Sequence, residues 1–308
     1  MMKSRLAWVS VLCAAALLSG CSDSGQGGDG TSPGPSGDAL SPGAVADRYG
    51  YDEATAEMTP VYELVPNYND VRGDVAVELV IRDCMRDVVE IPIMRSTEDP
   101  QFFEPRTAQA RKTEELAAQW GYAMHYPSLV LPEDPLNTDA ARAHREQVLA
   151  TPEAQAKLTE CQAQMRERLP QPPMDLMSTI EFAGWQAADV DPAVVKAAQA
   201  WRVCMEPAGV IDLPEDPMLM PSESIRKAAG VDDEFQDSAA PPASQWEKDI
   251  AVADVRCRES SGWTQARWDA RIQGELSAIG QDVQGFEAAR VAYAEWGAKV
   301  DSVMAELG

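Results

Sequence analysis

Four cysteines in the body of this 308-residue chain constrain its fold more than any other sequence feature. They are Cys84, Cys161, Cys204 and Cys257. An even number of cysteines is typical of exported proteins, in which they form disulfides. None of the four stands in a Cys-x-x-Cys pair or close to a histidine, so the sequence indicates neither a metal site nor a redox motif. We therefore expect two disulfides and no bound metal or cofactor.

The first 21 residues predict export and lipidation. Lys3 and Arg5 precede a short apolar stretch at 6–18, which is typical of a signal peptide and too short to span a bilayer comfortably. The stretch ends in Leu-Ser-Gly-Cys, which resembles the bacterial lipobox, where the cysteine is acylated before cleavage. The alternatives are a plain transmembrane anchor and an unprocessed signal. We expect removal of residues 1–20 and acyl chains, palmitate among them, on Cys21 at the outer face of the plasma membrane.

Residues 21–45 are rich in Gly, Ser, Asp and Pro and predict a flexible tether with an average reach of about 27 Å. The folded body would then start near residue 46. Removal of residues 1–20 takes away two basic residues, which leaves 24 basic residues against 50 acidic ones and a net charge of −26. Such a charge repels nucleic acid and anionic headgroups, so we expect no nucleic-acid partner.

The body predicts an all-α fold. Apolar residues recur at helical spacing, and no segment shows a convincing strand alternation. The expected helices cover 70–89, 106–120, 137–150, 151–169, 191–206 and 244–260. Thr151 and Asp191, each followed by proline, are typical N-caps, and Ser244 with Glu247 resembles a capping box.

The C-terminal segment, 272–307, carries apolar side chains at alternating steps of four and three residues. These are Ile272, Leu276, Ile279, Val283, Phe286, Tyr293, Val300, Met304 and Leu307. One interpretation is a coiled-coil-like seam for a partner helix or a second copy. The other is a long amphipathic helix packed on its own domain. Four glycines in the segment favour the second, because they weaken a free-standing helix.

Two segments, 84–100 and 204–217, suggest an internal duplication. Each begins with Cys-Met at the end of an amphipathic helix, runs to Glu-Asp-Pro, and is followed by a second helical cysteine. We interpret this as one helix–cystine–helix unit in each half, 46–172 and 173–308. Four cysteines allow three pairings, and the duplication favours Cys84 with Cys161 and Cys204 with Cys257.

These motifs carry a resemblance. "AWRVCM" (200–205), "EKDIAVADVRCR" (247–258) and the acidic amphipathic C-terminus resemble a group of uncharacterised secreted proteins and lipoproteins of actinobacteria. The resemblance covers most of the chain after the tether. In that group the first Cys-Met is commonly followed by a Gly-aromatic pair, where this chain has Val88-Val89. Some members lie beside export transporters or carry peptidoglycan-binding modules. The resemblance implies an envelope protein and no specific activity, and this chain shows no such module.

The sequence contains no familiar catalytic motif. His125 lies in an expected loop, where a catalytic base would need a positioned partner, and we expect an ordinary loop histidine. His144 falls on a charged helical face. The acidic run 232–234 could mimic a glycosidase pair, but adjacency means little among fifty carboxylates. Seven tryptophans could line a sugar or peptide groove, although at helical positions tryptophans more often belong to the core.

The sequence thus predicts an anchored, extracytoplasmic, mostly helical protein with no catalytic residue. The first functional hypothesis is a non-enzymatic binding or interaction protein of the envelope, such as an accessory to a transporter. Its recognition surface would come from helix faces, including the C-terminal seam. The alternatives are a cell-wall-active hydrolase that uses carboxylates or His125, and a small-ligand receptor with an aromatic groove.

Overall fold

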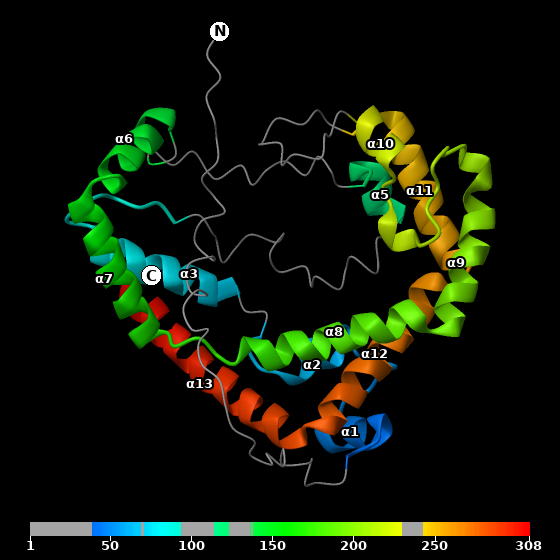
Figure 1. The fold of residues 1–308 in the computed structure, drawn as a ribbon, viewed down its shortest axis with the longest axis horizontal. Coiled ribbons are helices and arrows are strands. Elements are labelled where there is room, and N and C mark those ends of the chain that lie inside the picture. The colour runs from blue at the N-terminus through cyan, green and yellow to red at the C-terminus, as the bar shows by residue number, and fades with distance from the viewer. Residues whose placement is uncertain (1–38, 69–70, 94–113, 123–135, 137, 230–242) are drawn as a thin grey trace, which may run out of the picture. The chain divides into compact units, whose positions relative to one another are not determined.

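The computed structural model of the chain describes residues 39–68, 71–93, 114–122, 136, 138–229 and 243–308. Every regular element in these ranges is a helix, which confirms the all-α fold (Figure 1). In chain order they are α1 (Pro42–Tyr49), α2 (Pro60–Leu64), α3 (Val71–Met85), α5 (Glu114–Trp120), α6 (Asp139–Leu149), α7 (Pro152–Arg168), α8 (Met174–Val190), α9 (Pro192–Met205), η3 (Glu206–Ala208), η4 (Pro217–Leu219), α10 (Glu223–Ala228), α11 (Gln245–Ser260), α12 (Trp263–Gln281) and α13 (Val283–Leu307). Among these described helices, none is both long and apolar enough to cross a membrane.

Local capping chemistry sets several helix starts. Thr151, Asp191 and Ser244 each accept a hydrogen bond from a backbone N–H in the first helical turn, at 3.3, 2.7 and 3.1 Å. These are the N-caps expected from the sequence, and they satisfy donors that the helix itself leaves unpaired. Glu247 also serves a tertiary contact, because its carboxylate accepts the N–H of Tyr122 at 3.3 Å.

α8 and α12 form the central helix pair, and α8 is a helix that the apolar periodicity did not single out (Figure 1). The two helices are antiparallel. Asp189 near the end of α8 pairs with Arg267 near the start of α12, whereas Glu181 pairs with Arg271 one turn further along α12. The largest buried apolar cluster surrounds this pair and includes side chains from α1, α2 and α13.

Two disulfides join helices that are distant in the sequence. Cys84–Cys161 joins α3 to α7, and Cys204–Cys257 joins α9 to α11, each with a Cα–Cα distance of 5.6 Å. This confirms the pairing favoured by the repeat. In both cases the first cysteine is the penultimate residue of its helix, and the methionine that follows is buried. The Cys-Met motif therefore places a covalent bond and a core side chain at the same helix end.

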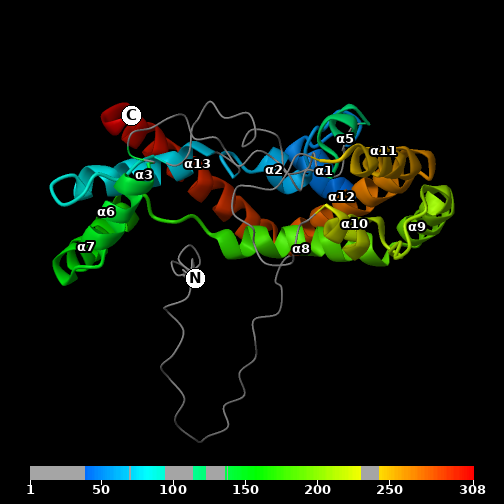
Figure 2. The ribbon, with the colours of Figure 1, turned by 90° about the horizontal axis from the view of Figure 1, so that it is seen from above.

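Helix packing crosses the boundary expected between residues 172 and 173. α13 lies beside α3 (Figure 2), and α5 packs against α11. Asp38–Gly308 form one compact unit. The repeat thus reflects a disulfide arrangement that occurs twice along the chain. It does not mark two separate domains, because helices of the two halves pack against each other.

α1 begins inside the segment expected to be tether, 21–45, which corrects the end of that segment. Ser41 caps α1, and Gly50 ends it in the left-handed conformation with a φ of 71°, which glycine adopts at little cost. Val45 is fully buried, and Leu40 donates its N–H to the carbonyl of Gly280 at 3.0 Å. The Gly- and Pro-rich composition predicted a flexible segment up to residue 45, although a short helix capped by Ser41 begins at Pro42.

Six of the nine apolar seam positions of the C-terminal segment are buried. The segment is divided at Asp282, whose carboxylate accepts the N–H of Gly285 at the start of α13 at 2.9 Å. Four of the seam residues are 0% exposed: Ile272, Ile279, Phe286 and Val300. Packing on the chain's own domain is therefore confirmed, and these buried side chains are not available to a partner helix.

Candidate functional site

A groove of about 440 Å³ lies along one face of α9. Within α9 the lining side chains stand one, four, five and eight residues after Val194, so they share one helical face. Trp263 and Arg267 of α12 and two acidic residues before η4 complete it. The lining residues, which we name the α9 groove, are Asp189, Val194, Val195, Ala198, Gln199, Arg202, Glu215, Asp216, Trp263 and Arg267. Its volume falls in the range of ligand sites, about 300–1,000 Å³.

Two N–H groups at this groove lack an acceptor. Trp263 is 1% exposed and Arg267 is 7% exposed. Arg267 donates from Nη1 to Asp189 at 3.0 Å, and its guanidinium lies 5.1 Å from the ring centroid of Trp185. Within the described ranges, Trp263 Nε1 and Arg267 Nε have no hydrogen-bond partner. Because an unpaired buried donor costs about 1–3 kcal/mol, an oxygen acceptor supplied to these groups would stabilise the site.

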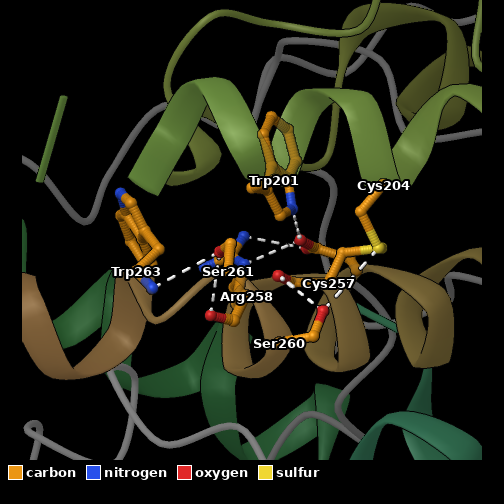
Figure 3. Close-up of a disulfide and its surroundings, with 8 residues drawn as sticks. Trp201, Cys204, Cys257, Arg258, Ser260, Ser261 and Trp263 are labelled. Carbon is orange, nitrogen blue, oxygen red and sulfur yellow. Dashed lines mark hydrogen bonds and ion pairs between the residues drawn. A yellow bond between two sulfur atoms is a disulfide. The ribbon is translucent and has the colours of Figure 1, made fainter. Parts of the chain in front are cut away.

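A buried ion pair holds the two sides of the groove together (Figure 3). Asp254 accepts hydrogen bonds from Arg258 Nε at 2.7 Å and from Trp201 Nε1 at 2.8 Å. Arg258 also donates to the carbonyl of Pro217 at 2.6 Å and lies 5.1 Å from the ring centroid of Trp263. One arginine of α11 therefore contacts both the segment that carries the acidic lining residues and the aromatic ring of α12.

The Cys204–Cys257 disulfide closes the same region at the end of α9 (Figure 3). Cys204 is exposed and Cys257 is buried, and the hydroxyl of Ser260 lies 3.8 Å from Cys204 Sγ. Trp201 lies one turn before Cys204 in α9, and its side chain is fully buried. The helix that carries the groove is thus fixed to α11 by a covalent bond and by a buried hydrogen bond.

Exposed apolar side chains are concentrated in the segments that border the groove. Of the eleven large apolar side chains exposed among the described residues, six fall between residues 190 and 219. They are Val190, Val195, Val203, Ile211, Met218 and Leu219. Val195 lines the groove, and Val190 and Val203 each directly follow a lining residue. Clustered exposed apolar groups are typical of interaction sites. We name these six residues together with the α9 groove the α9 surface.

The segment that carries most of the α9 surface is also acidic. Residues 189–219 contain six carboxylates and two basic side chains. The exposed Asp212 accepts hydrogen bonds from the hydroxyl of Ser222 at 2.6 Å and from the N–H of Ser224 at 2.8 Å. These bonds stabilise the carboxylate and lower the pKa of Asp212 to about 2. This segment therefore stays negatively charged well into the acidic range.

A second group of polar residues is buried where α2, α8 and α12 meet. Glu275 is 0% exposed and accepts hydrogen bonds from the N–H of Val61 at 3.1 Å and from Arg271 Nε at 2.9 Å. Arg271 lies 3.7 Å from Glu181, which accepts from the hydroxyl of Tyr68 at 2.8 Å. Burial raises the pKa of Glu275, and Arg271 opposes that shift. Glu181 and Glu275 both bond to neighbouring elements, and Glu275 is wholly buried. The group therefore joins helices and does not offer an acid–base pair to a substrate.

The structure separates the candidate residues suggested by the sequence. Cys21, His125 and the acidic run 232–234 lie outside the described residues. His144 is exposed on α6. Of the seven tryptophans after the signal segment, Trp246 alone is exposed, at 47%, so they do not line one open concavity. Among the described residues, no cluster of His, Cys, Asp and Glu is placed to hold a metal ion.

Sequence reasoning missed the residues that build the α9 surface. A signal was present for one pair, because Asp254 and Arg258 stand four residues apart in the helical segment "AVADVRCR". Trp263 and Arg267 have no local signature, since their position depends on the packing of α12. Comparison with protein-family models, curated proteins and solved structures finds no match for this chain. The geometry of the α9 surface is therefore the main guide to function.

Proposed function

We propose that this protein is a lipid-anchored, non-enzymatic binding protein of the cell envelope. It is held at the outer face of the plasma membrane through Cys21 and recognises its partner with the α9 surface. The partner belongs to the envelope, and an export transporter is one example. The single observation that carries the proposal is the α9 surface itself, which combines a 440 Å³ groove, six exposed apolar side chains and an excess of carboxylates.

Binding is favoured over catalysis by what the groove contains. Four of its five charged side chains form ion pairs, Arg267 with Asp189 at 3.0 Å and Arg202 with Glu215 at 3.8 Å, and Asp216 accepts the backbone N–H of Met218 at 2.8 Å. Neither a histidine nor a hydroxyl-bearing side chain lines it. Its carboxylates hold arginines and a helix start, and no imidazole or hydroxyl stands beside them, so the arrangement suits recognition better than hydrolysis.

Site-specific photo-crosslinking tests the proposal. A benzophenone amino acid is placed at Val195, on the groove, in the full-length chain produced in its native cells. The same residue at Val291 of α13 is the matched control, since the two valines are 46% and 57% exposed. We expect a discrete adduct at Val195, identified by mass spectrometry, and none at Val291. Equal adduct formation at the two positions, or none at Val195, would contradict the proposal.

A further inference from the structure

The chemistry of the α9 surface indicates the kind of partner that it recognises. The segment that carries most of it, residues 189–219, has six carboxylates against two basic side chains, and this excess of negative charge favours a cationic partner. A second copy of this chain would bring the same carboxylates against themselves, and like charges at an interface oppose binding. Anionic lipid headgroups are repelled for the same reason. Charge complementarity thus selects a ligand that carries Lys or Arg.

The apolar part of the surface requires more than a small cation. Val195, Val203 and Leu219 are aliphatic side chains that are between 46% and 65% exposed. Burying them against water-exposed aliphatic groups of a ligand is favourable in proportion to the area covered. A polyamine or a metal ion has no such groups, and a sugar presents hydroxyls instead. A chain of amino acids offers cationic and aliphatic side chains together.

The unpaired donors at the groove are consistent with a peptide backbone. Trp263 Nε1 and Arg267 Nε are N–H groups without a partner among the described residues, and a backbone carbonyl is an oxygen acceptor. Both nitrogens are buried in the structure. The lining side chains must therefore move slightly before a carbonyl oxygen of a ligand can reach them. The fluorescence of Trp263 is expected to change when this happens.

We infer that the α9 surface binds a linear peptide segment that carries basic and aliphatic side chains, presented by a protein partner in the envelope. This inference rests on the proposed function and specifies its ligand. The basic side chains of the peptide pair with the carboxylates before η4, Asp216 and the highly exposed Glu215, and at Glu215 they compete with the 3.8 Å contact from Arg202. The aliphatic side chains cover the exposed valines of α9.

Fluorescence anisotropy with the full-length, detergent-solubilised protein tests the inference. The probes are three labelled decapeptides: one of Lys, Val and Leu, one with Glu in place of Lys, and one with Ser in place of Val and Leu. We expect the first to bind at least tenfold more tightly than either of the others. Equal binding of the Lys–Ser peptide would show attraction by net charge alone and would overturn the inference, as would equal binding of the Glu peptide.

Matched variants locate the binding. Val195→Lys adds a repelling charge and removes an apolar contact on the groove, so it is expected to weaken binding of the Lys–Val–Leu peptide at least tenfold. Val291→Lys makes the same change on α13 and is expected to leave binding unchanged. Both sites are exposed, and circular dichroism verifies that both variants fold. Equal weakening by the two variants overturns the inference.

The photo-crosslinking experiment separates this inference from the proposed function. A glycan adduct at Val195 would overturn the inference and leave the proposed function intact. The absence of any adduct at Val195 would contradict both.

Discussion

Gly184 and Gly274 allow α8 and α12 to approach each other closely. A Cβ on Gly274 would lie 2.6 Å from the Cβ of Ala187 and 2.8 Å from the carbonyl oxygen of Ala183. A Cβ on Gly184 would lie 3.0 Å from the carbonyl oxygen of Arg271. Backbone atoms cannot move aside cheaply, so at these positions glycine is required by the neighbouring helix rather than by its own backbone conformation.

Substitution of Gly274 therefore tests the central helix pair. Gly274→Val is expected to lower the free energy of unfolding by about 1–3 kcal/mol, because it overpacks the contact with α8. Gly43→Ala is the control, since nothing lies within 4 Å of the added methyl group. Urea unfolding measures both variants. A loss of stability in Gly43→Ala as large as that in Gly274→Val would contradict the explanation.

Glu275 is expected to make the free energy of unfolding depend on pH. Burial raises its pKa above the ordinary value of 4.5, so the folded state binds the proton more tightly than the unfolded state. Its contribution to stability is then complete below about pH 4.5 and is lost as the pH rises through the raised pKa. Glu275→Gln cannot ionise and is expected to remove this loss.

The measurement for Glu275 is the free energy of unfolding at several pH values from about 4 to 8. The slope is the informative quantity, because Glu275→Gln also changes the contacts with Arg271 and Val61 and so shifts the stability itself. Glu215→Gln, an exposed change, serves as the control. Identical slopes for Glu275→Gln and the unsubstituted protein would show that the carboxyl does not behave as described.

At the scale of helices, the two disulfides occupy equivalent places but differ in access. Cys204 is exposed at the end of α9, whereas Cys161 is fully buried in α7 and Cys84 is half-buried. A reductant must reach a sulfur atom to break the bond. The disulfide beside the α9 surface is therefore the more accessible of the two.

Graded reduction is expected to follow this difference. In the folded protein, low concentrations of dithiothreitol should open Cys204–Cys257 before Cys84–Cys161, as detected by alkylation and peptide mass mapping. In denaturant the two bonds should open at similar concentrations, because folding no longer shields either of them. Earlier labelling of Cys84 and Cys161 in the folded protein would contradict this order.

Removal of either disulfide is expected to destabilise the helices that it joins. The loops that they close span 77 and 53 residues, and the chain-entropy model depends only weakly on loop length. Replacing each pair by alanines is therefore expected to cost a similar amount, about 2–4 kcal/mol. α9 also retains the hydrogen bond from Trp201 to Asp254, so its contact with α11 does not depend on the disulfide alone.

At the scale of the whole molecule, net charge and the proposed anchor act together. With residues 1–20 removed as proposed, the chain would carry a net charge of −26, which would oppose contact with an anionic membrane surface. Two acyl chains on Cys21 would hold the chain nonetheless, because each buried CH₂ contributes about 0.8 kcal/mol. The anchor and the charge would thus keep the protein at the membrane while leaving the α9 surface open to a partner.

The anchor has a direct test. Cells that produce the protein are labelled with radioactive palmitate, and we expect label in the full-length chain and none in Cys21→Ala. The variant is also expected to leave the membrane fraction. Cys13→Ala is the control, because this cysteine lies within the expected signal segment and its loss should not affect labelling. Label in Cys21→Ala equal to that in the unsubstituted chain would reject Cys21 as the site.

The sequence by itself determined the features that depend on near neighbours along the chain. Helical periodicity, the N-caps at Thr151, Asp191 and Ser244, and the recurring Cys-Met motif all involve residues within a few positions of one another. The disulfide pairing followed from the repetition of that local pattern. These features were predictable because the hydrogen bonds and apolar faces concerned are set within one or two helical turns.

Only the tertiary structure decided which faces meet. It turned the C-terminal seam inward, brought α13 onto α3 and α5 onto α11, and placed Trp263 and Arg267 of α12 beside α9. The close contact of Gly184 with Gly274 likewise depends on residues ninety positions apart. No local pattern specifies such contacts, because each depends on the shape and charge that a distant helix presents once the chain has folded.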